Sequence, residues 1–149
     1  MTLLCILLIL IYCGKGRQDS PEVYKTIVSG YFKSAFENDI QALSEQLHPD
    51  LIFLGPKLGD TLNNDGLIAS WIRFHRTFDR HEIQNVESYF IEDENTCQSV
   101  SFYYLAHFHH REKRTWIKFP VQTRFWFLDA EIRKILIIVN QADISAQLE

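Results

Sequence analysis

Apolar residues in the first half of the chain recur at the spacing of an α-helix. The run Ser20-Pro21-Glu22 offers a capping hydroxyl, a proline suited to the first helical turn and an acidic residue, and apolar side chains then follow at intervals of three and four as far as Phe36. Asn38-Asp39 interrupts this pattern and precedes a second, shorter pattern through Leu47, which we expect Pro49 to end. The sequence therefore predicts a long helix followed by a short one.

A short strand, a loop and a third helix are expected next. Residues 51–54 are apolar and residues 55–60 are rich in glycine and proline, which indicates a strand that runs into a loop. Asn63 or Asn64 is suited to cap a helix whose apolar residues recur as far as Phe78.

Beyond Phe78 the period changes from helical to alternating, which is typical of β-strands. Four β-prone runs are separated by turn residues, and they cover residues 86–91, 100–110, 116–128 and 132–140. In the second run one apolar side is expected to face the helices, and it consists of Val100, Phe102, Tyr104, Ala106 and Phe108. The pattern predicts an α+β fold in which three helices cover one face of an antiparallel meander.

The composition indicates a single domain that is rich in aromatic residues. The chain has 149 residues and 46% hydrophobic content, which suits a single well-filled core. Its 11 Phe, 6 Tyr and 3 Trp residues line either a dense core or an apolar cavity, and the sequence leaves both readings open.

Charge excludes one class of partner. The net charge is −4, with no extended basic field of the kind that phosphate backbones require, so we expect no nucleic-acid binding. His107 and His109 share one side of a predicted strand, but no third ligand accompanies them, and we expect neither a metal nor a cofactor.

The N-terminus has a different character from the rest of the chain. Residues 3–12 form an unbroken apolar run that is too short for a membrane-spanning helix, and Cys13 begins a polar tether that lasts to residue 21. This arrangement resembles a bacterial lipoprotein leader, in which the cysteine at the cleavage site is lipidated, although bulky residues precede Cys13 and no basic residue precedes the apolar run. The resemblance implies a protein of the bacterial cell envelope, anchored through Cys13. Plain secretion, an uncleaved anchor and a segment without a targeting role remain alternatives.

Two motifs in residues 22–149 carry a second resemblance. The segment HPDLIFLGP at residues 48–56 and the segment FWFLDAEI at residues 125–132, in this order of helices and strands, resemble the NTF2-like superfamily and most of all its SnoaL-like branch. The resemblance implies a cone in which a strongly curved mixed or antiparallel sheet and three N-terminal helices enclose an apolar pocket for a small hydrophobic ligand. It also implies a homodimer through the outer face of the sheet, where we expect Trp116, Trp126, Ile135 and Ile137.

The resemblance also implies where catalytic chemistry would lie. Enzymes of this superfamily transfer protons beside a carbonyl group, with a carboxylate on a late strand or at the end of the last strand. Aligning the hairpin motifs puts Thr123 and Asn140 at these two places. A carboxamide cannot take up a proton, so Asn140 is expected either to bind a ligand or to satisfy backbone groups where the last strand stops.

Other polar residues complete the set of candidates. His75 and Asp143 are candidate acids or bases, with a hydrogen-bonded structural histidine and the cap of a final helical turn as the respective alternatives. The candidate ligand-binding residues besides Thr123 and Asn140 are Tyr31, Trp71, Tyr104 and His110, and core packing is the alternative for the two tyrosines.

Two classes of function follow from these observations. The first is a noncatalytic, envelope-anchored domain that binds a small hydrophobic molecule or a protein partner, and the absence of an inward carboxylate favours it. The second is a small acid–base enzyme of isomerase, cyclase, dehydratase or hydrolase type.

Overall fold

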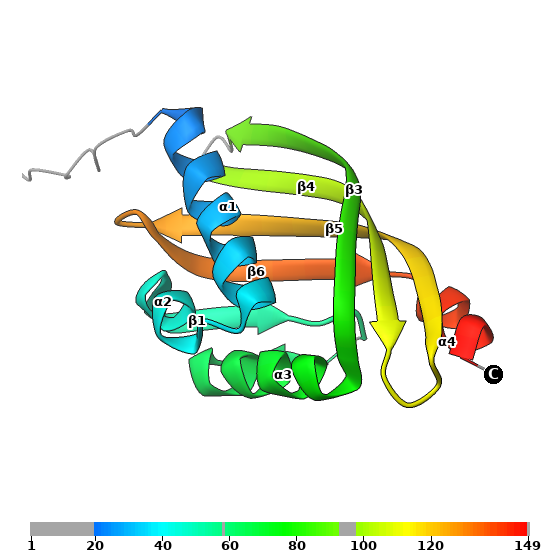
Figure 1. Ribbon diagram of the computed structural model, residues 1–149. Helices are drawn as coiled ribbons and strands as arrows, with labels where there is room; N and C mark the ends of the chain where they lie inside the picture. The colour runs from blue at the N-terminus through cyan, green and yellow to red at the C-terminus, as the bar shows by residue number, and fades with distance from the viewer. Residues whose placement is uncertain (1–19, 58, 93–97, 149) are drawn as a thin grey trace, which may run out of the picture.

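The computed structural model, which describes residues 20–57, 59–92 and 98–148, confirms the α+β class (Figure 1). The helices are α1 (Pro21–Glu37), α2 (Ile40–Glu45), α3 (Asn64–Thr77) and α4 (Gln141–Leu148). The strands are β1 (Leu47–Leu54), β2 (Thr61–Leu62), β3 (Phe78–Glu92), β4 (Gln98–His110), β5 (Thr115–Leu128) and β6 (Glu131–Val139). No helix in these ranges is long and apolar enough to cross a membrane.

All six strands belong to one mixed sheet with the order β2-β1-β6-β5-β4-β3. The pairing of β1 with β6 is parallel, and the other pairings are antiparallel. In Figure 1 the sheet curls around α1, and α3 lies beside β1 at the edge. The helices and the concave face of the sheet therefore enclose the core.

Local side-chain hydrogen bonds explain where the helices begin and end. Asn38 has a left-handed backbone (φ 60°) that ends α1. Asp39 Oδ1 accepts from Ala42 N at 3.0 Å and starts α2, and Asn63 Oδ1 accepts from Gly66 N at 3.0 Å and starts α3. Ser20 precedes α1 as expected, but its side chain makes no capping hydrogen bond.

Two predicted boundaries are wrong, and the cause is the same in both. The short helix ends at Glu45 and not at Leu47, because Leu47 already begins β1, and Pro49 lies where the register between β1 and β6 shifts. Likewise β3 begins at Phe78 and not at residue 86. In each case strand pairing extends over polar residues that have no hydrophobic alternation.

The buried face of β4 confirms the alternation that the sequence predicted. Val100, Phe102, Tyr104, Ala106 and Phe108 are all buried, and they belong to the main hydrophobic cluster with α1.

The expected outward position of Ile135 and Ile137 is wrong. Trp126 pairs with Lys134 while Phe127 pairs with Ile132, so Arg133 is an extra residue in β6. This irregularity reverses the alternation, and Ile135 is only 1% exposed. The large apolar side chains that the outer face of the sheet exposes include Tyr89, Tyr103 and Ile138.

Candidate functional site

Two adjoining pockets lie on the helix side of the sheet. The inner pocket has a volume of about 210 Å³ and lies among α1, α3 and the inward side chains of the sheet. Its lining residues are Tyr31, Phe32, Phe36, Phe53, Leu67, Ser70, Trp71, Phe74, Tyr104, Phe108, Phe119, Val121, Thr123, Ile135, Ile137 and Val139. Within the described part of the chain, this lining contains no charged side chain. The inner pocket is thus suited to an uncharged, apolar group.

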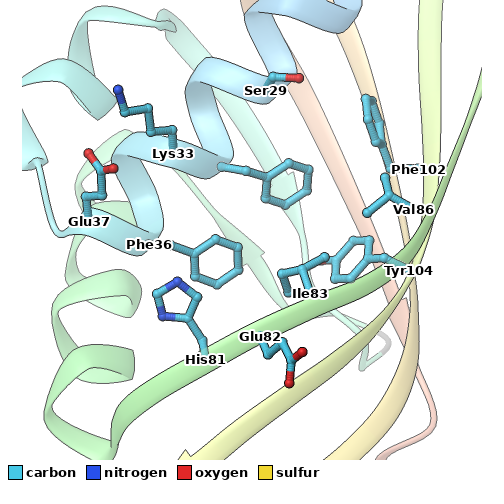
Figure 2. A pocket seen from close by; sticks show the side chains of 11 residues that line it. Ser29, Lys33, Phe36, Glu37, His81, Glu82, Ile83, Val86, Phe102 and Tyr104 are labelled. Atoms are coloured by element: carbon cyan, nitrogen blue, oxygen red, sulfur yellow. The ribbon is translucent and has the colours of Figure 1, made fainter.

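The outer pocket lies between α1 and β3 and has a volume of about 520 Å³ (Figure 2). It is lined by Ser29, Phe32, Lys33, Phe36, Glu37, His81, Glu82, Ile83, Val86, Phe102 and Tyr104. Phe32, Phe36 and Tyr104 line both pockets, so these three rings form a shared wall.

Three hydroxyl groups of the inner pocket belong to two hydrogen-bonded pairs, and a fourth, Ser70 Oγ, donates to the backbone oxygen of Leu67 at 2.7 Å. Trp71 Nε1 donates to Tyr31 Oη at 3.1 Å, and Tyr104 Oη lies 3.4 Å from Thr123 Oγ1. Burial raises the pKa of Tyr31 far above its ordinary value and raises the pKa of Tyr104 to about 12. Both phenols are therefore protonated near neutral pH, and they can donate or accept a hydrogen bond but cannot serve as bases.

The structure brings four of the predicted site residues together. Tyr31, Trp71, Tyr104 and Thr123 all line the inner pocket, and they come from α1, α3, β4 and β5. Their ligand-binding role remains a prediction.

Two predicted histidines lie outside both linings. His75 Nε2 lies 2.7 Å from the backbone oxygen of Ala35, a contact in which the histidine donates, and it joins α3 to α1. His110 Nδ1 accepts from Lys113 N at 3.2 Å in the turn between β4 and β5, and its ring contacts Phe78. These contacts agree with structural roles for both side chains.

Asn140 and Asp143 also lie away from the two pockets. Asn140 Oδ1 accepts from Ala142 N at 3.1 Å, so Asn140 precedes and caps α4, whereas Asp143 is an exposed residue of the first turn. This hydrogen bond agrees with the alternative in which Asn140 satisfies a backbone group where the last strand stops. Cys13, the predicted lipidation site, lies outside the described residues.

His81 is a candidate that the sequence reasoning missed. It lies in the polar stretch Asp79–Glu82, which was expected to precede the strand, but β3 already includes it and places it at the outer pocket. The His81 ring lies parallel to that of Phe36, with the two centroids 4.5 Å apart at an angle of 18°. Although the residue as a whole is exposed, partial desolvation lowers the pKa of His81, and the nearby His75 lowers it further.

The other five histidines all have a polar partner. His48 accepts from Asp50 N, His75 and His110 contact backbone groups, and His107 and His109 lie 3.5 and 2.6 Å from the carboxylates of Glu82 and Asp79, respectively. For His81, in contrast, the described residues provide no hydrogen bond and no ion pair. Its ring nitrogens are therefore available to a ligand.

Carboxylates contribute little to the interior of either pocket. Glu82 accepts from Gln84 Nε2 at 2.8 Å and lies near His107, and these contacts lower the pKa of Glu82. Glu37 and Lys33 are exposed residues of α1 at the rim of the outer pocket. Nowhere in residues 20–57, 59–92 and 98–148 do three His, Cys, Asp or Glu side chains come close enough to hold a metal ion.

Comparison with known proteins gives matches by structure and none among family profiles or curated proteins. A candidate SnoaL-like polyketide cyclase from Shewanella denitrificans has 19% identity and a TM-score of 0.70, over 87% of this chain and 98% of that one.

Two further solved structures share the architecture. An NTF2-like protein from Burkholderia xenovorans has 14% identity and a TM-score of 0.67, over 87% of this chain and 98% of its own. A protein with a ketosteroid isomerase-like fold from Catenulispora acidiphila, solved with trimethylamine, has 16% identity and a TM-score of 0.69, over 87% and 93% of the two chains. The fold is therefore the expected NTF2-like fold, and identities this low establish the fold alone.

Proposed function

We propose that this protein binds a small hydrophobic molecule on the helix side of its sheet, and that it does so without chemical change to the part held in the inner pocket. The observation that carries the proposal is the pair of adjoining pockets with a shared aromatic wall. The inner pocket offers apolar rings and protonated hydroxyls but no ionisable side chain that could act as a base near neutral pH. Such a lining orients a ligand and does not readily exchange protons with it.

The two hydrogen-bonded pairs, Tyr104 with Thr123 and Trp71 with Tyr31, would recognise a polar group of the ligand in different ways. The contact of 3.4 Å between Tyr104 Oη and Thr123 Oγ1 is long for a hydroxyl pair, so either hydroxyl can turn toward a ligand at small cost. The hydrogen bond from Trp71 to Tyr31 is shorter, at 3.1 Å, and leaves the phenol hydrogen of Tyr31 free to donate. A carbonyl or hydroxyl oxygen is the group that these donors fit.

Calorimetric titration of residues 20–149 with 1-octanol and with cyclohexanone tests this proposal. We expect saturable binding and a higher melting temperature, because a ligand that binds only the folded state stabilises it. Val121→Phe places a larger side chain at the inner pocket and should weaken binding at least tenfold. Leu105→Phe adds the same ring on the opposite face of the sheet and should bind as the unmodified protein does.

Absence of binding for both compounds at millimolar concentration would contradict the proposal. Equal weakening by Val121→Phe and Leu105→Phe would place the binding elsewhere. Melting temperatures and circular dichroism of both variants establish that the comparison is made between folded proteins.

A small acid–base enzyme is the second candidate function, and the unpartnered imidazole of His81 at the outer pocket favours it. Several proteins with this fold are candidate polyketide cyclases. The test is whether the protein accelerates exchange of the α-hydrogens of cyclohexanone in deuterated water, measured by proton NMR. If His75→Gln or Asp143→Asn abolishes the exchange, the result supports the predicted catalysts. If only His81→Gln abolishes it, the activity belongs to His81. Binding without exchange would support the noncatalytic function.

We also propose that the domain is held at the bacterial cell envelope through Cys13. The support is the apolar run of residues 3–12, the cysteine directly after it and the polar tether up to residue 21. The tether would hold the binding domain near the membrane surface.

A further inference from the structure

We propose that the outer pocket selects molecules in which an apolar body carries one acidic oxygen group, and that His81 takes up a proton when such a molecule binds. The inference rests on the proposed binding function and names the chemical class of its ligand. The apolar body would lie against the shared wall, and the acidic group would contact the imidazole.

The first argument is the availability of the His81 ring nitrogens. Five of the six histidines use a ring nitrogen within the protein, through a backbone group or a carboxylate. No described residue contacts His81 in this way, although His81 lines the larger of the two pockets on the helix side. A neutral imidazole has one donor and one acceptor nitrogen, and both are free here for a ligand.

The second argument is that the ring is held in place without a polar contact. Figure 2 shows His81 and Phe36 one above the other at the outer pocket. The nearly parallel stack covers one face of the imidazole, and Phe32 and Phe36 are themselves stacked at 12°. Because a stacked ring presents its nitrogens at its edge, the contact orients the imidazole but leaves its polar atoms unused.

The third argument concerns the charges that surround His81. From α1, Lys33 and Glu37 lie one turn apart at the rim and carry opposite charges. From α3, His75 lowers the pKa of His81. From β4, the residue in register with His81 is Phe108, and the phenol of Tyr104 is neutral.

Glu82, the neighbour of His81 on β3, does not supply the missing negative charge. Its carboxylate accepts from Gln84 Nε2 and lies 3.5 Å from His107 Nδ1 on β4, and within the described residues no ion pair joins it to His81. An imidazolium at position 81 therefore has no committed counter-ion in the described structure. A ligand carboxylate would supply this counter-ion and would make protonation of His81 favourable.

The proton balance of the proposed binding step is simple. A carboxylic acid is ionised in solution at neutral pH, so it enters as a carboxylate, and one proton from the solvent adds to the neutral imidazole. The product is an imidazolium–carboxylate pair, and no covalent bond of the ligand is formed or broken. Binding should thus consume up to one proton for each ligand molecule.

A matched set of three probes tests the inference in residues 20–149. Octanoate, 1-octanol and octylamine share one hydrocarbon chain and differ in the charge of the terminal group. We expect octanoate to bind at least tenfold more tightly than the other two at pH 6. Its affinity should fall by up to tenfold for each pH unit between the pKa of His81 in the free protein and the higher pKa of His81 in the complex. Calorimetry in two buffers of different ionisation enthalpy measures the proton uptake directly.

His81→Phe preserves the stack on Phe36 but removes the nitrogens, so it should abolish both the preference for octanoate and the proton uptake. His48→Gln is the matched control, because His48 lies on β1 and lines neither pocket, and it should leave both unchanged. If His81→Phe fails to fold, His81→Gln replaces it, and the proton uptake is measured on the unmodified protein in any case.

The outcomes separate this inference from the proposed function. Equal affinity for octanoate and 1-octanol, or binding of octanoate without proton uptake, would overturn the inference and leave the binding function intact. Tighter binding of octylamine would also overturn it and would point to Glu37. Failure of all three probes and of cyclohexanone to bind would refute the proposed function itself.

Discussion

One pair of side chains, Tyr31 and Trp71, both holds two helices together and supplies a polar group to the inner pocket. Tyr31 on α1 and Trp71 on α3 are joined by a hydrogen bond, and each ring also packs in the aromatic cluster. A buried indole N–H needs an acceptor, so the same contact that binds two helices together also places a phenol at the pocket.

Tyr31→Phe should therefore destabilise the protein more than its small change in shape suggests. The variant leaves Trp71 Nε1 without its acceptor, at a cost of about 1–3 kcal/mol in the free energy of unfolding. Urea denaturation measures the loss. Tyr103→Phe, at a tyrosine that is 40% exposed on the outer face, is the control and should change stability very little; equal effects of the two variants would contradict the argument.

Alkaline pH should unfold the protein through its buried phenols. Burial raises the pKa of Tyr104 from 10.0 to about 12 in the folded state, so the unfolded state loses this proton first. The corresponding stability is complete below pH 10.0 and is lost as pH rises through about 12. Thermal melts between these pH values should show this fall, and Tyr104→Phe should make it shallower; an equally steep fall in the variant would assign the effect to other groups.

Irregular positions within strands shape the sheet at the scale of elements. β3 changes register between Gln84 and Glu87, and Asn85 within this segment has a left-handed backbone (φ 53°). The irregularity falls directly after Ile83 and next to Val86, both of which line the outer pocket. The bend in β3 therefore helps to form this pocket.

Substitutions at Asn85 test the importance of this bend. Asn85→Gly should be tolerated, because glycine adopts the left-handed region freely, whereas Asn85→Val should cost about 1–2 kcal/mol. The free energy of unfolding and the affinity for 1-octanol are the two measurements. A valine variant as stable as the glycine variant would show that the strand can be straightened without loss.

The same irregular positions mark the limit of prediction from sequence. Alternation in residues 100–108 identified the inward side of β4, and the asparagine and aspartate caps identified the starts of α2 and α3. The extra residue Arg133 has no signature in the sequence, because arginine occurs as readily in a regular strand, and one such residue reversed the faces of Ile135 and Ile137.

The candidate site could be predicted only in part, because only some of its residues belong to a periodic pattern. Tyr31, Trp71 and Tyr104 follow from helical and strand periodicity, whereas Thr123 follows from the resemblance of the hairpin motifs. The structure places all four in one lining. His81 occurs among charged residues with no apolar alternation, so only the pairing of β3 with β4 shows that it reaches a pocket. The partners of the other histidines are long-range contacts in several cases, and these cannot be deduced from local sequence.

At the scale of the whole molecule, the outer face of the sheet is the surface proposed for self-association. It bears a groove of about 860 Å³ whose lining includes Tyr89, Tyr103 and Ile138. These side chains are 52%, 40% and 49% exposed, and such grouped apolar residues on a monomer are typical of an interface. The homodimer stays a prediction, and these three residues replace Ile135 and Ile137 at the centre of its proposed contact.

Light scattering at micromolar concentration tests the dimer. We expect a mass of two chains for residues 20–149, and the mass of one chain for the double variant Tyr103→Asp and Ile138→Asp, because like charges would meet across a twofold contact. Arg76→Asp, at an exposed position on α3, serves as the control for added charge. A monomer in every case would remove the prediction.

The membrane anchor belongs to the same scale and is tested in bacterial cells. The full chain should incorporate radiolabelled palmitate and partition with membranes, whereas Cys13→Ser should lose the label. Cys5→Ser changes a cysteine within the apolar run and should keep it. Membrane partition of Cys13→Ser without label would instead favour an uncleaved apolar anchor.

The shared wall between the two pockets has a consequence for how such a protein can diverge. Phe32 and Phe36 lie one turn apart on α1, and both line the inner and the outer pocket. Smaller side chains at these two positions would join the pockets into a single longer chamber, without any change in the strands that carry Thr123 and Tyr104. The space for a ligand is therefore set on α1 and can change while the hydroxyl groups of the inner pocket stay the same, so a descendant of this protein can acquire a larger ligand through two substitutions on one helix. A smaller residue at position 36 would also remove the ring that stacks on His81, so the same change would loosen the group proposed to contact an acid.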